Sequence, residues 1–293
     1  MGTLYITIIL LCRIVQHLFS KPRSDMISGL RMFLGYSVFK NFVCSVFGLC
    51  LVLLSGAALQ ADLLTIAIAV FSGLSMSVAS YAGVLALKSG TIALNAMFSS
   101  AGLIVPCIAG IFMFNAPLSI LQWCGLGVFL ISSWLLTSDA QKTCQTFRPK
   151  TILVLLLSLL SNGSTMLAQQ LFTHFRPNGN ISLFSLLSFG IVGLFMLILF
   201  ICTGSRKQES AVRLPGKLLF CGVFLAAALF VINQLSTAAT AVVEPVVLFS
   251  FITCGGTIIG AIIAHLFFNE KITLRKALGI AVGILSLIII KVF

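Results

Sequence analysis

Apolar stretches of about twenty residues, separated by short breaks that contain glycine, proline or charged residues, run along almost the whole chain. About twenty helical residues cross a hydrocarbon core of roughly 30 Å, so the pattern predicts ten membrane-spanning helices. Their expected ranges are 2–19, 27–55, 62–86, 91–114, 118–137, 151–173, 180–203, 215–236, 241–268 and 273–291. No loop between them is long enough to fold separately. We therefore expect an all-α polytopic membrane protein.

Like residues recur about 154 positions apart, which indicates an internal duplication. In the last two expected helices of each half, the matched pairs include Gly102 with Gly256, Phe114 with Phe268, Gly125 with Gly279 and Ser132 with Ser286. Each half would hold five helices, and because five is odd the second copy would cross the membrane in the opposite direction. We predict two inverted five-helix repeats, residues 1–140 and 148–293, an organisation typical of secondary transporters.

The composition supports a bilayer environment and excludes a water-soluble globule. Of the 293 residues, 59% are hydrophobic and only 8% are charged. The net charge of +12 does not point to nucleic acid, because the eighteen Lys and Arg residues are scattered between apolar runs and form no basic face. The expected surroundings are therefore lipid, with no nucleic-acid partner.

The basic residues instead predict the orientation. Fourteen of them lie at the ends after the first, third, fifth, seventh and ninth helices, whereas Arg176 and Lys291 lie at the opposite ends. By the positive-inside rule, both termini should face outwards from the plasma (cell inner) membrane. We expect no cleavable signal, because the first apolar run lacks a basic segment before it and a small-residue cleavage site after it.

Several motifs resemble the EamA-like family of the drug/metabolite transporter superfamily. The motifs of the second half are Asn233-Gln234-Leu235, Gly255-Gly256, Phe268-Asn269-Glu270-Lys271-Ile272-Thr273 and Lys276-Ala277-Leu278-Gly279. The motifs of the first half are Ala86-Leu87-Lys88-Ser89-Gly90, Pro106, Asn115 to Ser119 and Gln122 to Gly125. The resemblance implies a transporter fold. The first copy departs from the second in having Ala116 where the second has Glu270. Many members of the superfamily place both termini in the cytoplasm, which differs from the orientation that the charges predict.

Three ionisable residues lie inside apolar segments and are candidate site residues: Arg13, Lys40 and Glu244. Such residues usually face the bundle interior or a water-filled cavity. Arg13 and Lys40 are at matching depth in one expected hairpin, where an anionic ligand would relieve their repulsion; alternatively, both extend their side chains to the interface. Glu244 is a candidate for proton coupling or for binding a substrate amine, although a Glu before Pro245 also suits a helix N-terminus.

Amide side chains form a second group of candidates. The group consists of Gln16, Asn41, Asn95, Asn162, Gln169, Gln170, Asn233 and Gln234, and several of these should line the cavity. Those expected to bind substrate are Gln16, Asn95, Asn162, Gln169 and Asn233. Amides both donate and accept hydrogen bonds, so they can bind a carboxylate, amide or hydroxyl without burying an ion. The alternative is that they join helices to one another.

Small residues recur every four positions in the ninth expected helix. Gly256, Gly260 and Ala264 would form a flat face for a neighbouring helix, and Gly255 with Gly256 would either act as a hinge or pack closely. The nine cysteines include no C-x-x-C pair, and the three histidines lack metal-ligand spacing. We expect no metal site and no cofactor.

The pattern contains no nucleophile elbow, P-loop or paired carboxylates, so we expect no enzyme activity. We predict a secondary carrier, monomeric or homodimeric, for a small polar or amphipathic metabolite, such as an amino acid or another carboxylate. The rivals are a proton-coupled exporter of cationic drugs that uses Glu244, and a non-transporting membrane scaffold or sensor.

Overall fold

The fold was analysed in a computed structural model, which describes residues 2–56, 60–89, 92–114, 118–137, 149–204, 214–268 and 273–292. In these ranges the chain is helical, with short turns and no strand. The difference between Ala116 and Glu270 lies outside the described residues, as do the flanking Asn115 and Asn269.

The first half of the chain follows the predicted order of helices, with one interruption. Its helices are α1 (Gly2–Met26), α2 (Leu30–Leu54), α3 (Leu63–Ser89), α4 (Ile92–Ala101), α5 (Ile104–Phe114) and α6 (Ile120–Thr137). The helix expected at 91–114 is therefore broken, and Gly102 and Leu103 form a turn between α4 and α5. α1 extends past its expected end, through Pro22.

The second half is interrupted at the corresponding place. Its elements are α7 (Pro149–Phe175), α8 (Ile181–Gly204), α9 (Gly216–Ala239), α10 (Pro245–Ser250), the π-helical turn η2 (Phe251–Gly255), α11 (Gly256–Phe268) and α12 (Leu274–Val292). The helix expected at 241–268 begins only at Pro245, because residues 240–243 form turns after α9. A π turn accommodates one extra residue in a helix and is frequent at functional sites.

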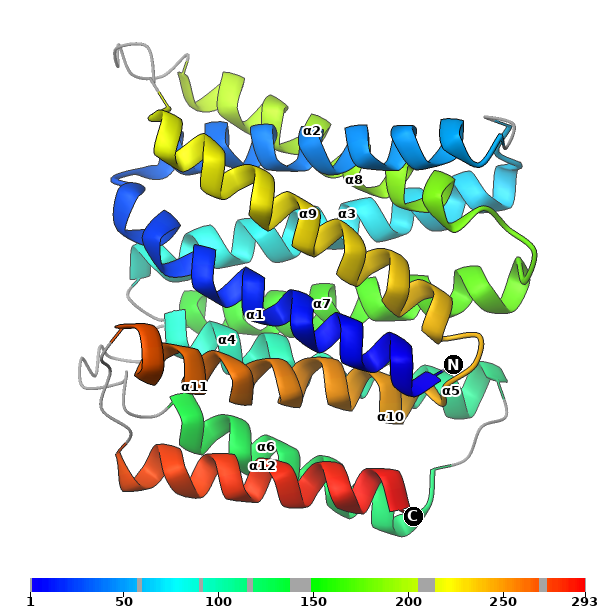
Figure 1. Cartoon of the computed structure of the whole chain (residues 1–293), viewed down its shortest axis with the longest axis vertical. Coiled ribbons are helices and arrows are strands. Elements are labelled where there is room, and N and C mark those ends of the chain that lie inside the picture. Colours follow the sequence, from blue (N-terminus) through cyan, green and yellow to red (C-terminus); the bar gives the residue numbers. More distant parts are fainter. Residues whose placement is uncertain are drawn as a thin grey trace.

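Eight helical stretches among the described residues are long and apolar enough to cross a membrane, and Ile120–Leu136 in α6 is a shorter apolar helix. α12 carries Arg275, Lys276 and Lys291 and is not one of the eight. The helices lie side by side, and both termini lie at one end of the bundle, which we call the terminal end (Figure 1). We call the opposite end, where α1 finishes and α12 begins, the basic end.

Packing between the helices is dominated by a few long seams. α2 packs along α8, α6 along α12, α3 along α7 and α1 along α9, with further contacts of α3 on α8, α2 on α9 and α1 on α11 (Figure 1). α1 is therefore separated from α2 by α9 for most of its length. The largest buried apolar cluster, which includes Leu103, Phe129, Ile232 and Phe249, joins both halves of the chain.

Candidate functional site

Two large polar side chains of α1 fit against two glycines of α11. Arg13 and His17 are one turn apart on α1, and Gly256 and Gly260 are one turn apart on α11. A Cβ atom at Gly256 would lie 3.4 Å from Cδ and Nε of Arg13, and one at Gly260 would lie 2.7 Å from Cε1 of His17. Any larger residue at position 260 would therefore force either the His17 ring or α1 to shift.

The equivalent contact in the first half is between backbones. A Cβ atom at Gly102, in the turn between α4 and α5, would lie 2.6 Å from the carbonyl oxygen of Leu159 in α7. The counterpart of Gly102 is Gly256, which meets the side chain of Arg13 in α1, and the preceding Gly255 meets the side chain of Leu10. Side chains therefore separate the backbones of α1 and α11, whereas the backbone at Gly102 lies directly against the backbone of α7.

A cavity of about 430 Å³ lies beside this glycine face. Its volume falls within the range of small-molecule sites. The lining residues come from α1, α4, α6, α7, η2, α11 and α12, and they include Arg13, His17, Ser99, Asn162, Thr253, Thr257 and Lys276. Because Lys276 lies near the start of α12, the lining extends from the middle of α1 towards the basic end.

Arg13 is the main charged group deep in this cavity. Its Nη1 donates a 2.8 Å hydrogen bond to Oε1 of Gln16, while its Nε is buried with no hydrogen-bond partner. Lys276 is the other residue of fixed positive charge in the lining, and no described lining residue is acidic. A buried cation without a counterion is costly, so an anionic group would be stabilised here.

The polar residues near Arg13 present both hydroxyl and amide groups. Asn162 Nδ2 donates to the carbonyl oxygen of Ser158 at 2.9 Å, and the hydroxyls of Ser99 and Ser158 are 2.5 Å apart. Thr253 and Thr257 direct their hydroxyls to carbonyls one turn back in their own helix. Asn95, next to the lining residue Ala96, has a buried Oδ1 without a partner but does not itself line the cavity.

Lys40 does not join Arg13 in this cavity. It is half-buried on α2, which packs against α8 and α9, and it is not among the lining residues. The expectation that one ligand sits between the two cations therefore finds no common cavity among the described residues.

Gln169 and Asn233 lie in a separate hydrogen-bonded network that joins α7, α8 and α9. Gln169 Nε2 donates to Asn233 Oδ1 at 2.7 Å, and Asn233 Nδ2 donates to Ser185 Oγ at 3.0 Å. The network continues from Ser185 to Gln234 and from Gln234 to Ser182. Each amide is already bonded to a neighbouring helix, which is the arrangement expected of residues that join helices.

Glu244 lies at the terminal end, away from the cavity. It is exposed and precedes Pro245, the first residue of α10, so its charge lies close to the positive end of that helix. Nε2 of Gln122 lies 3.3 and 3.5 Å from its two carboxylate oxygens. Gln122 also caps α6 reciprocally with Ser119. This environment matches the helix-terminus interpretation.

No chemistry was predicted for His17, and Ser99, Thr253 and Thr257 were not predicted as site residues, although all four line the cavity. Lys276, which also lines it, was recognised only as part of a family motif. The spacing of Arg13 and His17, matched by that of Gly256 and Gly260, was the available signal for His17. The described residues contain no cluster of His, Cys, Asp and Glu that could hold a metal ion, and their eight cysteines are unpaired.

Comparison with known proteins identifies the family. Residues 149–292 match the model of the EamA-like transporter family, and no curated protein matches the sequence. A solved crystal structure superposes with a TM-score of 0.79 at 12% identity, covering 98% of this chain and 95% of the other, which shows a shared fold. The resemblance inferred from sequence is thereby confirmed: residues 149–292 of this multi-pass membrane protein match the EamA-like transporter family, which belongs to the drug/metabolite transporter superfamily.

Proposed function

We propose that the protein is a secondary carrier for a small polar metabolite with a carboxylate, such as an amino acid, and that the substrate binds in the cavity beside Arg13. The observation that carries this proposal is the buried Arg13 Nε, which has no partner, in a cavity of about 430 Å³ whose described lining contains no acidic residue. A carboxylate would supply the missing acceptor, and Asn162 and the threonines would bind its polar neighbours.

We further propose ten crossings in two inverted repeats, residues 1–140 and 148–293. The packing supports this organisation, because exchanging the halves maps the longest seams onto one another. The seam of α3 with α7 corresponds to that of α9 with α1, and α3 with α8 corresponds to α9 with α2. The two interruptions also lie close together in the repeat, because Gly102 corresponds to Gly256, which directly follows η2. Interrupted helices at a repeat interface are typical of carrier substrate sites.

The proposed orientation places the basic end in the cytoplasm of a plasma membrane and both termini outside. Because the cavity lining reaches Lys276 near the basic end, this state would face inwards. Alternating access would then require the two halves to rock about the α2–α8 and α6–α12 seams. A gradient or exchange would drive transport; proton coupling and a monomeric or homodimeric state stay predictions.

The two rival functions have less support. An exporter that couples through Glu244 would need this carboxylate to reach the substrate, and it lies outside the cavity lining. A sealed scaffold would need no polar cavity beside a buried cation. Neither rival accounts for the unpartnered Arg13 Nε.

The test is a thermal-stability screen of the purified chain against small carboxylates and their uncharged amides, at two pH values. A ligand that binds only the folded state stabilises it by about 2.7 kcal/mol at a concentration of 100 times its Kd. We expect a carboxylate to raise Tm and its amide to have no effect. Arg13→Gln should weaken carboxylate binding by roughly tenfold to a hundredfold, the value of a charge-assisted hydrogen bond.

Lys40→Gln is the matched control, since it also removes a cation from within a helix but not from the cavity. It should leave the carboxylate-dependent shift unchanged. Uptake of the same ligand into proteoliposomes then tests transport directly. Equal stabilisation by carboxylates and amides, or unchanged binding in Arg13→Gln, would contradict the proposed site.

A further inference from the structure

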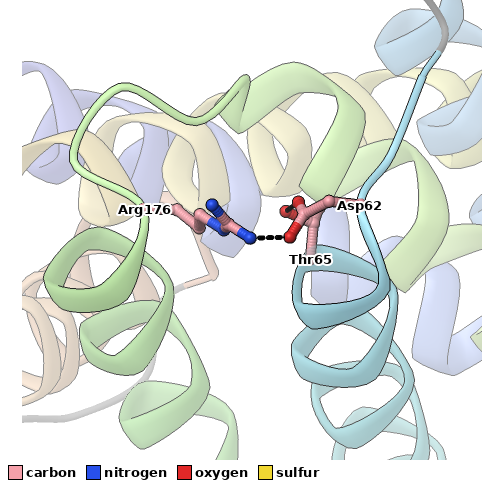
Figure 2. A network of polar contacts seen from close by, with 3 residues as sticks. All are labelled: Asp62, Thr65 and Arg176. Atoms are coloured by element: carbon pink, nitrogen blue, oxygen red, sulfur yellow. Dashed lines mark hydrogen bonds and ion pairs between the residues drawn. The ribbon is translucent and has the colours of Figure 1, made fainter.

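An ion pair joins the two halves of the chain at the terminal end of the bundle. Arg176 Nη2 contacts Oδ2 of Asp62, and the hydroxyl of Thr65 donates to Oδ1 of Asp62 at 2.5 Å (Figure 2). Asp62 directly precedes α3, and Arg176 directly follows α7. The pair therefore bridges the end of the α3–α7 seam, with one partner from each half.

The surroundings of the pair are polar and open. A pocket of about 370 Å³ surrounds it, lined by residues that include Gln60, Asn178 and Asn180. The side chains of Arg176 and Asp62 are 41% and 43% exposed. Water can therefore solvate both groups when they separate, so the contact can open without burying an unpaired charge.

Among the residues that the structure describes, the corresponding seam of α1 with α9 at the basic end shows no such pair. Arg176 corresponds to Arg23 at an offset of 153 residues, and Asp62 corresponds to Gly216 at an offset of 154, so the arginine recurs and the carboxylate does not. The guanidinium of Arg23 lies over the ring of Tyr36, 5.8 Å from its centroid. The seam itself holds a mainly apolar groove of about 570 Å³ lined by residues that include Phe19 and Phe220.

We infer that Asp62 and Arg176 form a one-sided latch, which holds the terminal end of the α3–α7 seam closed while the cavity is accessible from the basic end. The inference rests on the proposed carrier function, because a latch has meaning only if the halves move. When the halves rock, α3 and α7 separate at this end and the pair breaks. Thr65 positions the carboxylate for re-engagement.

A half-exposed ion pair gives only modest stabilisation, and we expect its loss to shift the population of the two states by about two- to fivefold. The shift should shrink at high ionic strength, because salt screens exposed charges. A contact of this size biases the equilibrium without preventing opening.

Hydrogen–deuterium exchange of the purified full-length chain tests the latch, using Asp62→Asn, Arg176→Gln and the charge-reversed double variant Asp62→Arg/Arg176→Asp. In each single variant, amides in the first turns of α3 and the last turn of α7 should exchange about two- to fivefold faster. Amides of α11 beside the cavity should exchange more slowly, because opening one end closes the other. In the double variant, the exchange rates at the α3–α7 seam and in α11 should return towards the wild-type values.

Asp25→Asn is the matched control, since it removes an exposed carboxylate at the basic end. This substitution should leave amide exchange unchanged at both the α3–α7 seam and the α1–α9 seam. Unchanged exchange at the α3–α7 seam, or a uniform increase in all helices, would overturn the latch, the second because it indicates general destabilisation. If exchange became faster at the α3–α7 seam and slower in α11 but the chain transported no substrate, the latch would be supported and the carrier function contradicted. If the chain transported substrate but exchange at the α3–α7 seam did not change in the variants, only the latch would be overturned.

Discussion

The hydroxyl of Ser132 in α6 donates a 2.7 Å hydrogen bond to the backbone carbonyl of Gly279 in α12. The reciprocal bond runs from Ser286 of α12 to the carbonyl of Gly125 of α6, at 2.9 Å. Both serines are fully buried, and each serine and glycine corresponds to its counterpart at an offset of 154 residues. The two bonds are therefore equivalent halves of one interface.

Ser132→Ala and Ser286→Ala should lower the free energy of unfolding by similar amounts, about 0.6 kcal/mol each and at most about 1.7 kcal/mol. The reason is that each substitution removes one interhelical bond of the same kind. Reversible unfolding in mixed detergent measures both. Ser80→Ala is the control, because its hydroxyl bonds to Met76 within its own helix. If only one of the two substitutions lowered the free energy of unfolding, the two hydrogen bonds would not be equivalent.

Gly260→Ala should destabilise the protein by about 1–3 kcal/mol, because the new methyl group would lie 2.7 Å from the His17 ring. Thermal unfolding with and without ligand measures the loss of stability and of binding. Gly127→Ala is the control: no atom lies within 4 Å of the new Cβ, so the higher helix propensity of alanine should make it neutral or slightly stabilising.

His17→Ala should rescue much of the effect of Gly260→Ala, since it removes the ring that the methyl group meets. The double-mutant cycle gives the coupling directly. Additive effects of the two substitutions would mean that α1 and α11 do not pack through this pair.

Asn233→Leu should cost about 1–3 kcal/mol, because it leaves the buried amide of Gln169 without its acceptor. The double variant Gln169→Leu/Asn233→Leu should be less destabilised than the sum of the single variants, since both partners become apolar. Ligand binding should persist in it, as neither residue lines the cavity. Loss of binding without loss of stability would instead place these amides in the substrate site.

Glu244→Gln should leave the pH dependence of transport unchanged and reduce stability by about 0.3–1 kcal/mol, the usual value of a charge near a helix N-terminus. Uptake measured across a pH series, together with thermal unfolding, separates the two effects. If the uptake rate of Glu244→Gln no longer depended on pH, Glu244 would take part in proton coupling.

The sequence predicted the helices well, because hydrophobic length is a local property. The ends of α2, α7 and α12 lie within a few residues of their expected positions. The interruption at Gly102 and the π turn at 251–255 were not predicted, since both depend on packing against other helices. The glycine pair at 255–256 was recognised, and its packing against Leu10 and Arg13 agrees with the packing interpretation.

The candidate site was predicted in part. Arg13 and Asn162 line the cavity, because an unpaired cation and an amide flanked by small residues can be recognised in sequence. Lys40, Gln169 and Asn233 lie elsewhere in the structure, because hydrophobicity does not reveal which face of a buried helix meets which neighbour. The repeat offset pointed to Arg13, which has no charged counterpart in the second copy.

The π-helical turn η2 also sets the rotation of everything that follows it. If residues 251–255 became α-helical without a change in length, the extra residue would no longer be absorbed, and α11 would rotate by about 100° relative to α10. Gly256 and Gly260 would then turn away from Arg13 and His17. The backbone geometry at this point of the chain is thus as strictly constrained as residue identity, whereas loops at the membrane surface can tolerate insertions and deletions.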